Sequence, residues 1–427
     1  MKKLILILTT VVAFAFSLQA QDVRTKLQEN PERYANVLHS YEAPESIVDT
    51  PAPKGYEPFY VSHYGRHGSR YHVSMNPVTR VSTIFDRLDS LQMLTAEGAR
   101  VHEALKRLEA MHEDQAGYLT LRGGAEHQGI SQRMYERVPS VFAQGDRTRV
   151  VAESSPIQRC IQSLANFTLV LRGNAPQLRF DVYAGERFMK HIAPGTTVPR
   201  AKEHFPIFDS VLVARFDPTR VMNAWFKDPW DAAQNLGKYD VRNFIYYVFY
   251  AGNICQCLAM DYLDVPDFYA FFTEDELYAL WYAGDISHYD SLANTVENQN
   301  RFNETGKPIL EDIVAKADAA IAGNDVAADL RFGHDTGLMP LWSYLRVEGA
   351  GNEKPLPMAE APEKGWYCFE QMPMASNLQL VFYRDKSGDV LVKILRNEQE
   401  VTIPAVKPWK GPYYRWKDLR SYFVSLP

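Results

Sequence analysis

Hydrophobic positions along this chain have the short runs and alternation of strands mainly near its two ends, and the spacing of helices through its middle. Short apolar, β-prone runs predict strands at 59–62, 149–152, 178–183 and 329–332. Near the end, apolar residues alternate with others at 378–382 and again at 390–394, on either side of a Lys-Ser-Gly-Asp turn, which predicts a hairpin. Helical spacing predicts helices from Val81, from Thr95 and over roughly 126–142, and it continues from about 200 to 325.

This order of elements predicts an α/β protein with a mixed, mostly parallel sheet core that is flanked by helices. Residues 55–195 and 326–427 are expected to form the core. Residues 196–325 are expected to form a large, mostly α-helical insertion domain, and the helices near 95–142 could belong to either part. Residues 21–54, with four prolines, are expected to form an N-terminal arm.

The first twenty residues have the pattern of a bacterial secretory signal peptide. Lys2 and Lys3 precede an apolar run from Leu4 to Phe16, and Ala20 supplies a small residue for cleavage. A membrane anchor is the alternative, but about 15 apolar residues are few for a span. We therefore expect cleavage after Ala20, a mature chain without a membrane span, and a periplasmic or secreted location.

Composition narrows the classes of partner. The chain of 427 residues is 46% hydrophobic and 23% charged, which is typical of a globular protein. Its formal net charge of −6 provides no general attraction for nucleic acid, so no nucleic-acid partner is expected. The four cysteines, at 160, 255, 257 and 368, are expected to be buried thiols or to form one disulfide.

The first candidate for chemistry is the segment Arg66-His67-Gly68-Ser69-Arg70, directly after a predicted strand. Guanidinium groups match phosphate oxygens in geometry and charge, and imidazole can attack phosphorus as a nucleophile. Because protonation would add a third positive charge between two arginines, His67 is expected to stay neutral. Alone, the segment could equally be a loop whose arginines pair with surface acids.

Two further segments also follow predicted strands. In Gly333-His334-Asp335-Thr336, His334 could bind an oxyanion, and Asp335 could protonate a leaving oxygen and later activate water. Arg159 falls one turn into a predicted helix after strand 149–152. Neither segment is specific alone. Open α/β sheets bind their ligands at the carboxyl ends of strands, where all three segments are placed.

In combination these segments resemble the histidine phosphatase superfamily, in particular its branch of histidine acid phosphatases, phytases and multiple inositol-polyphosphate phosphatases. That branch carries R-H-G-x-R-x-P near the start and His-Asp or His-Ala-Glu near the end. Leu119, Thr120, Gly124 and Gln128 also resemble its L-T-x-x-G-x-x-Q stretch, with one residue of slack. His72 stands where the motif has proline. The late His-Asp pair is typical of acid phosphatases and many phytases, whereas inositol-polyphosphate phosphatases usually have His-Ala-Glu.

The resemblance implies a mechanism. It assigns phosphate binding to Arg66, Arg70, Arg159 and His334. His67 would attack phosphorus to form a phosphohistidine, and Asp335 would protonate the leaving alkoxide and then activate water. Because Asp335 must first be protonated, an acidic pH optimum is expected. The arginines would provide the positive charge that a metal ion provides elsewhere, so no metal and no cofactor are expected.

The expected partner is a small-molecule phosphate ester, and inositol polyphosphates such as phytate are the favoured substrates. A polyphosphorylated substrate needs further cations, for which Arg187 and Lys190 are candidates; as the alternative, these are solvated surface charges. Other functions stay open: a broad-specificity acid phosphatase, a mutase-type relative, and a non-catalytic periplasmic protein that binds phosphate esters.

Overall fold

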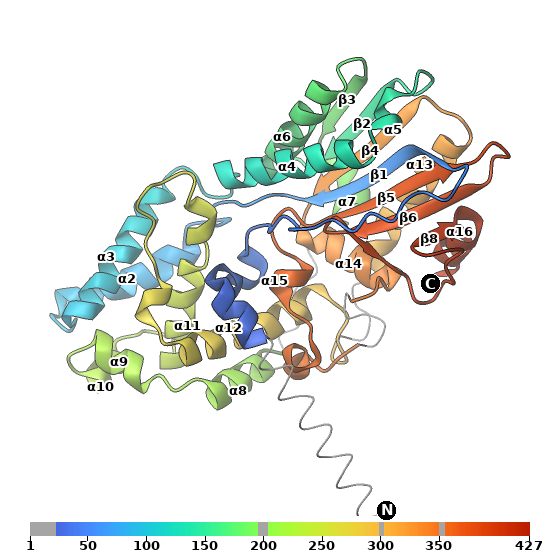
Figure 1. The fold of residues 1–427 in the computed structure, drawn as a ribbon. Helices are drawn as coiled ribbons and strands as arrows, with labels where there is room; N and C mark the ends of the chain where they lie inside the picture. Colours follow the sequence, from blue (N-terminus) through green and yellow to red (C-terminus); the bar gives the residue numbers. More distant parts are fainter. Residues whose placement is uncertain (1–22, 195–203, 299–302, 350–354) are drawn as a thin grey trace, which may run out of the picture.

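The computed structural model describes residues 23–194, 204–298, 303–349 and 355–427 (Figure 1). At its centre is an eight-stranded sheet in the order β3-β2-β4-β1-β5-β6-β7, with β8 paired to β6. The strands are β1 (Glu57–Arg66), β2 (Arg149–Ser154), β3 (Arg179–Ala184), β4 (Val326–Gly333), β5 (Asn377–Arg384), β6 (Val390–Arg396), β7 (Gln399–Val401) and β8 (Tyr413–Arg415). The first four in spatial order are parallel, and β5 to β8 are antiparallel. The predicted α/β class with a mixed sheet is confirmed.

The sheet forms where it does because its central strands are apolar on both faces. All eight residues of β4 are buried, which is typical of a parallel strand covered by helices on each side. Side chains of β1 alternate between two hydrophobic clusters: Val61 belongs to one, and Tyr60 and Tyr64 belong to the other.

Helices cover both faces of the sheet. On one face, α4 (Leu121–Arg137) packs on α6 (Gln158–Asn174), α6 packs on β2 and β4, and α5 (Pro139–Ala143) packs on β1. On the other face lie α7 (Met189–Ile192), α13 (Asn303–Ile321), α14 (Asp335–Leu345) and α16 (Trp416–Ser425). A short helix, α15 (Cys368–Gln371), packs against the 3₁₀ helix η1 (Pro31–Leu38) of the N-terminal segment.

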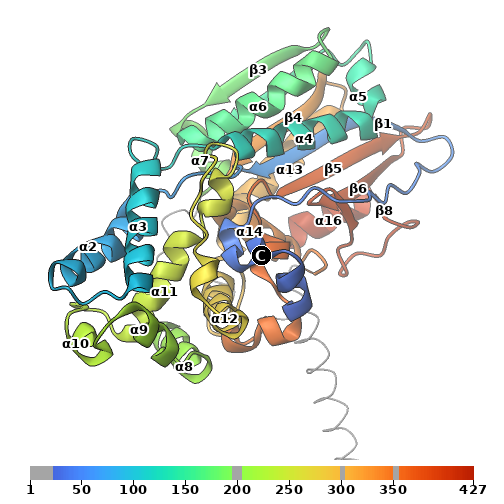
Figure 2. The same cartoon turned by 60° about the vertical axis from the view of Figure 1, so that its left-hand side comes forward.

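The remaining helices form a block beside the sheet, as Figures 1 and 2 both show. They are α2 (Asn76–Ser90), α3 (Ala96–Met111), α8 (Phe205–Arg215), α9 (Thr219–Trp225), α10 (Pro229–Gln234), α11 (Val241–Gly252) and α12 (Glu274–Leu292). Contacts of α2 with α3 and α11, and of α3 with α9, join the early and the middle parts of the chain. The block therefore draws on two separate stretches of sequence, and α13 packs on the sheet instead.

Helix starts follow local capping signals. The side chain of Thr95 accepts from the N–H of Gly98 at the start of α3. Thr273 and Glu276 form the predicted capping box of α12. The predicted single helix over 126–142 is wrong in its bounds: α4 begins at Leu121, after the capping Thr120, and ends at Arg137. It ends there because Pro139 disfavours helical geometry in the residue before it.

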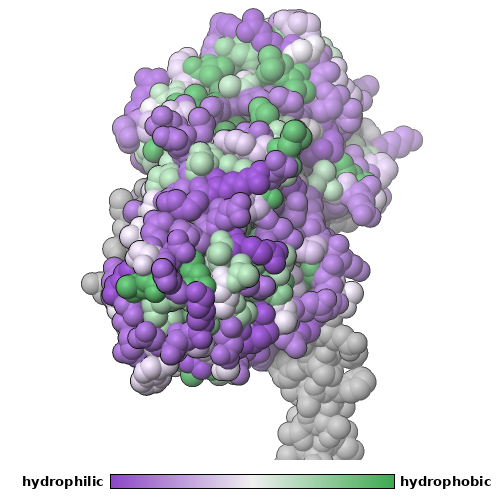
Figure 3. Space-filling view, turned by 90° about the vertical axis from the view of Figure 1, so that its left-hand side faces the viewer, coloured by the Kyte–Doolittle hydropathy of each residue, from purple (hydrophilic) through white to green (hydrophobic). Residues whose placement is uncertain are grey.

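Several sequence-based expectations concern the ends and the surface. The predicted signal peptide, residues 1–20, lies outside the described residues. Within the described ranges, no helix is both long and apolar enough to cross a membrane. The face that carries the helical block is mostly hydrophilic, with small separate hydrophobic patches (Figure 3). All four cysteines are buried free thiols.

Candidate active site

The candidate active site lies where parallel strands end at one edge of the sheet. Arg66, the last residue of β1, pairs with Gly333 of β4, and Ser154 at the end of β2 pairs with Phe332. The N–H group of His67 donates to the carbonyl oxygen of Gly333 at 2.9 Å. The structure thus brings the early and late motifs side by side.

Arg66 is fully buried and connects three parts of the chain. Its Nη1 atom donates to the carbonyl oxygens of Val37 at 2.9 Å and Met372 at 2.6 Å. Its Nη2 atom lies 2.9 Å from Oδ2 of Asp335. Because both backbone contacts hold the guanidinium plane, its orientation is fixed before any ligand binds.

His67 is held as a neutral imidazole with one nitrogen free to attack. Its Nδ1 atom lies 3.0 Å from the carbonyl oxygen of Gly68. A carbonyl oxygen only accepts, so Nδ1 carries the hydrogen and Nε2 keeps its lone pair. Burial, followed by the charges of Arg159, Arg66 and Arg70, holds the pKa of His67 well below its usual value of 6.5. This is the protonation state that a nucleophile requires.

Four buried guanidinium nitrogens in this region have no hydrogen-bond partner among the described residues; one is Nη2 of Arg66, which has only the ion pair with Asp335. The other three are the Nε atoms of Arg66, Arg70 and Arg159. Burial, together with the positive charges of Arg159 and Arg66, lowers the pKa of Arg70 to about 10. Unpaired buried donors are costly, so this cluster of positive charge is suited to an anion that supplies several oxygens.

The late motif places a second neutral histidine beside a carboxylate. His334 lies 3.1 Å through Nε2 from Oγ of Ser155 and 3.4 Å through Nδ1 from Nη2 of Arg159. Burial and the charge of Arg159 lower the pKa of His334 to about 4. Asp335 begins α14. Burial acts to raise its pKa, but Arg66, with smaller contributions from His334 and Arg70, lowers it below the usual 3.8.

The loop that carries His67 is supported by the start of α4. A Cβ atom on Gly68 would lie 2.5 Å from the carbonyl oxygen of Gly123, so this close approach requires glycine. Glu126 accepts from the N–H of Ser69 at 2.7 Å and from its hydroxyl at 2.6 Å. The sequence analysis did not single out Glu126, because nothing local connects it to a loop 57 positions earlier.

Residues of α6 next to Arg159 were also missed. The Sγ atom of Cys160 lies 3.2 Å from the carbonyl oxygen of Gly333 and 3.6 Å from Nε2 of His334. The hydroxyl of Ser163 accepts from the N–H of Gly68 at 3.1 Å. Their spacing, one and four positions after Arg159, is the signal that could have identified them, since it places Ser163 one helical turn further on.

His72, at the position of the motif's proline, ties the loop to the helical block. Its Nε2 atom donates to the carbonyl oxygen of Ala251 at 3.0 Å, and its backbone N–H donates to Nε2 of His112 at 3.2 Å. A proline has no N–H and could not make the second bond. Burial lowers the pKa of His72 to about 3, so the ring is a neutral structural element.

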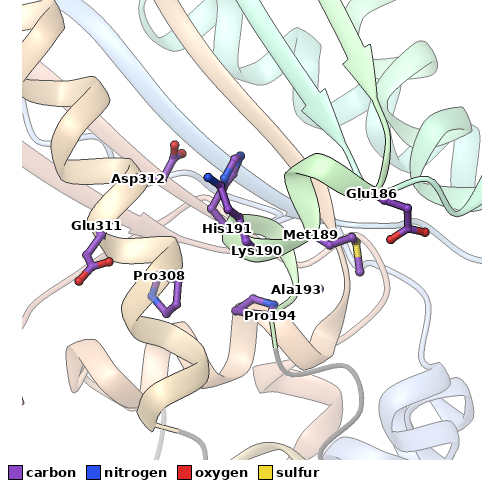
Figure 4. Close-up of a pocket in the computed structure, with 9 residues that line it drawn as sticks. All are labelled: Glu186, Met189, Lys190, His191, Ala193, Pro194, Pro308, Glu311 and Asp312. Carbon is purple, nitrogen blue, oxygen red and sulfur yellow. The ribbon is translucent and has the colours of Figure 1, made fainter.

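The two further cations suggested by the sequence lie on and before α7. Lys190 lines a cavity of about 740 Å³ between α7 and α13, together with Glu186, Glu311 and Asp312 (Figure 4). The guanidinium of Arg187 lies over the rings of Phe188 and Tyr183, at 4.6 and 5.5 Å. Within the described residues, neither side chain forms a hydrogen bond or an ion pair with His67 or Asp335, and their part in substrate binding stays a prediction.

One group of potential metal ligands occurs in the described part of the chain: Glu153, His191 and Asp312, whose ligand atoms lie within 4.8 Å of one another. The Nζ atom of Lys316 lies 2.6 Å from Oε2 of Glu153 and 3.3 Å from Oδ2 of Asp312. Arg331 also pairs with Asp312. Because two cations already balance these carboxylates, the group is an ion-pair network that offers no ready place for a metal.

Fold and site together define a class: α/β enzymes that hydrolyse phosphoric monoesters at a histidine set among arginines. A model of the histidine phosphatase superfamily (branch 2) matches residues 65–397, and the chain belongs to this family. No match was found among curated proteins.

Solved structures show the same fold at low sequence identity. The chain is similar to the Bifidobacterium longum multiple inositol polyphosphate phosphatase in complex with inositol hexasulfate, with a TM-score of 0.76 and 18% identity over 92% of this chain and 98% of that chain. It is also similar to the phytase from D. castellii, with a TM-score of 0.65 and 15% identity over 93% and 85% of the two chains. It is similar as well to the Hafnia alvei phytase in its apo form, with a TM-score of 0.53 and 13% identity over 88% of this chain and 98% of that chain.

Proposed function

We propose that the protein hydrolyses inositol polyphosphates such as phytate, outside the cytoplasm, through a phosphohistidine at His67. The observation that carries the proposal is the neutral His67, with its Nε2 lone pair free, among three arginines whose buried Nε donors find no partner in the described part of the chain. The substrate class is taken from the proteins to which the fold is similar, and the location from the pattern of residues 1–20.

The first chemical step would transfer the phosphoryl group to His67. The lone pair of Nε2 forms the N–P bond while the ester P–O bond breaks, and the carboxyl group of Asp335 gives its proton to the leaving oxygen. Before phosphate binds, Arg66 favours the ionised form of this carboxyl. Bound phosphate carries negative charge that offsets the arginines, so its binding favours protonation of Asp335.

The second step would release inorganic phosphate. The Asp335 carboxylate accepts a proton from water, the water oxygen bonds to phosphorus, and the N–P bond breaks with its electron pair returning to Nε2. His67 is then neutral and Asp335 protonated, ready for another cycle. Arg66, Arg70 and Arg159 stabilise the charge on the transferring group in both steps.

The test is phosphate release between pH 3 and 8, in the presence of EDTA, from phytate and from a simple aryl phosphate side by side. Strong preference for phytate supports the proposed substrate class. Equal or better turnover of the aryl phosphate supports the broad-specificity acid phosphatase. His67→Ala is the control: it should lose turnover by orders of magnitude while still binding phosphate. If His67→Ala releases phosphate as fast as the parent protein, the phosphohistidine mechanism is wrong.

A further inference from the structure

Two backbone carbonyl groups hold the guanidinium of Arg66, and neither belongs to the strand that carries it. One is the carbonyl of Val37, near the end of η1, and the other is that of Met372, the residue after α15. Both η1 and α15 pack against α12 of the helical block, and they also pack against each other. Whatever fixes these two segments therefore also fixes Arg66.

The first connection from the helical block is Asp285, a fully buried residue of α12. Its Oδ1 atom accepts from the N–H of Cys368, the first residue of α15, at 2.7 Å. A single turn follows, closed by the N–H of Met372, which donates to the carbonyl oxygen of Cys368 at 2.8 Å. Asp285 thus holds one end of the turn whose other end presents the carbonyl of Met372 to Arg66.

Asp285 makes this bond as a neutral carboxyl group. Burial raises the pKa of Asp285 well above its usual value of 3.8, the bond from Cys368 lowers it, and the charge of Glu370 raises it. Its second oxygen, Oδ2, finds no hydrogen-bond partner within the described ranges. A buried polar atom without a partner costs stability and needs an explanation, and the support of α15 provides one.

The second connection is Asn36 of η1, which is also buried. Its Nδ2 atom donates to the carbonyl oxygen of Trp281 on α12 at 3.2 Å. Gly284 permits this approach, because a Cβ atom there would lie 2.7 Å from Nδ2 of Asn36. The backbone of Asn36 has φ 53° and ψ −121°, a conformation that favours glycine. The side-chain bond therefore helps to hold an unfavourable backbone conformation directly before Val37.

We propose that Asp285 and Asn36 are positioning residues for the phosphate site, which from α12 hold the two carbonyl groups that orient the guanidinium of Arg66. They act through Arg66 and not on the substrate itself. Because Arg66 lies 2.9 Å from Asp335, the same two bonds support the position of the proposed acid. This inference rests on the proposed function and deepens it, since it gives the helical block a part in ordering the catalytic arginine.

Binding of inorganic phosphate to the full chain, measured by calorimetry, tests the inference without turnover. Asp285→Leu removes the acceptor that holds α15, and we expect phosphate to bind roughly tenfold more weakly. Asp285→Asn keeps an acceptor oxygen and is uncharged like the protonated acid, so its affinity should stay within about twofold of the parent. Asn36→Gly permits the same backbone conformation and removes only the amide, and its affinity should fall about threefold.

A double-mutant cycle separates the positioning of Arg66 from a general loss of structure. In the Arg66→Met background the guanidinium is gone, so Asp285→Leu should weaken phosphate binding no further. Tyr289→Phe is the matched control on α12. The hydroxyl of Tyr289 accepts from the N–H of Leu356 at 3.0 Å, a bond that holds neither η1 nor α15. This variant should lose stability and keep the phosphate affinity of the parent.

The outcomes separate this inference from the proposed function. If Asp285→Leu or Asn36→Gly binds phosphate as tightly as the parent, the inference is overturned for that residue. If Asp285→Leu weakens binding equally with and without Arg66, it is overturned as a whole, and in either case the phosphate site stands. If Asp285→Leu does not fold, Asn36→Gly decides, alone and in the Arg66→Met background. If the folded parent binds no phosphate, the phosphate site itself is wrong and the inference falls with it.

Discussion

The guanidinium group of Arg66 lies 2.9 Å from the carboxylate of Asp335 and joins two residues that are far apart in the chain. The contact exists because β1 and β4 are parallel neighbours that end at the same level. It fixes the position of Asp335 and lowers the pKa of this carboxyl, although burial acts to raise it. The proposed acid is therefore a carboxylate until phosphate enters.

Asp335→Asn should lower turnover by roughly 10²- to 10⁴-fold, because asparagine neither protonates a leaving oxygen nor deprotonates water. The loss in the first step should be larger for an alkyl phosphate than for an aryl phosphate, whose leaving group needs no proton. Pre-steady-state kinetics with both substrates measure this. Equal losses in the first step for both substrates would contradict the role of Asp335 as the acid.

Arg66 and Arg159 should differ in their effects on stability. Arg66→Met leaves the buried carbonyl oxygens of Val37 and Met372 without their donor and Asp335 without its counter-ion, so the free energy of unfolding should fall by about 2–4 kcal/mol. Arg159→Met, with fewer protein contacts, should cost about 1 kcal/mol or less, while phosphate binding weakens in both variants. Urea unfolding and phosphate titration test this; equal stability losses would show that Arg66 has no special structural role.

The pH profile should lack a transition at the ordinary histidine pKa. His67 stays neutral well below pH 6.5, and His334 down to about pH 4, so acidification from pH 7 to 5 leaves both rings unprotonated. It also favours the protonated form of Asp335 in the complex. We expect kcat/KM to hold or rise over this interval, and an acidic limb with an apparent pKa near 6.5 would contradict the account.

Stability, in contrast, should decrease as the pH falls below about 6.5. The pKa is depressed in six buried histidines: His63, His67, His72, His112, His127 and His334. In the unfolded chain these rings take up protons below pH 6.5, which favours unfolding by roughly 1.4 kcal/mol per pH unit for each ring.

The four carboxyls whose pKa is raised act in the opposite direction but are fewer: Asp285 and Asp329, which are buried, and Glu126 and Asp261, which are half-buried. Urea midpoints at pH 7 and 5 measure the net effect. His127→Leu removes one titrating ring. It should therefore reduce the slope of the unfolding free energy against pH by about 1.4 kcal/mol per pH unit, the contribution of one proton. A stability that rises from pH 7 to 5 would contradict this assignment.

The support of the catalytic loop by α4 can be tested with a matched pair of variants. Glu126→Gln replaces one of the two acceptor oxygens with an NH₂ group that cannot accept, so at least one of the three hydrogen bonds from Tyr41 and Ser69 is lost; it should lower kcat several-fold and destabilise the fold by about 1–3 kcal/mol. Glu136→Gln, on the same helix but exposed, should change neither. Normal activity in Glu126→Gln would show that this support is dispensable.

The sequence predicts much of the fold, because its strands are compact apolar runs and several helices carry local caps. Thr95 and Thr273 mark helix starts that the structure confirms. The end of α4 was missed because the restriction that Pro139 places on the residue before it overrides a helical apolar pattern that continues past it.

The site was predictable only where the chemistry lies within one short segment. The arginines and histidines of the two motifs stand next to one another in sequence. Glu126 and Cys160 reach the site from helices, and only the packing of α4 and α6 brings them to it. The aromatic run of α11 favoured a role in the helical core, and in the structure it supplies core side chains and also one wall of a cavity.

The most direct test of the central claim is to trap the phosphorylated enzyme. Asp335→Asn would be mixed with an aryl phosphate, quenched in alkali, which preserves phosphohistidine, and digested for mass spectrometry. We predict that one phosphoryl group is found on His67 and that the double variant with His67→Ala carries none. If the protein turns over substrate with no phosphoryl group on His67, or if the group is found on another residue, the account is contradicted.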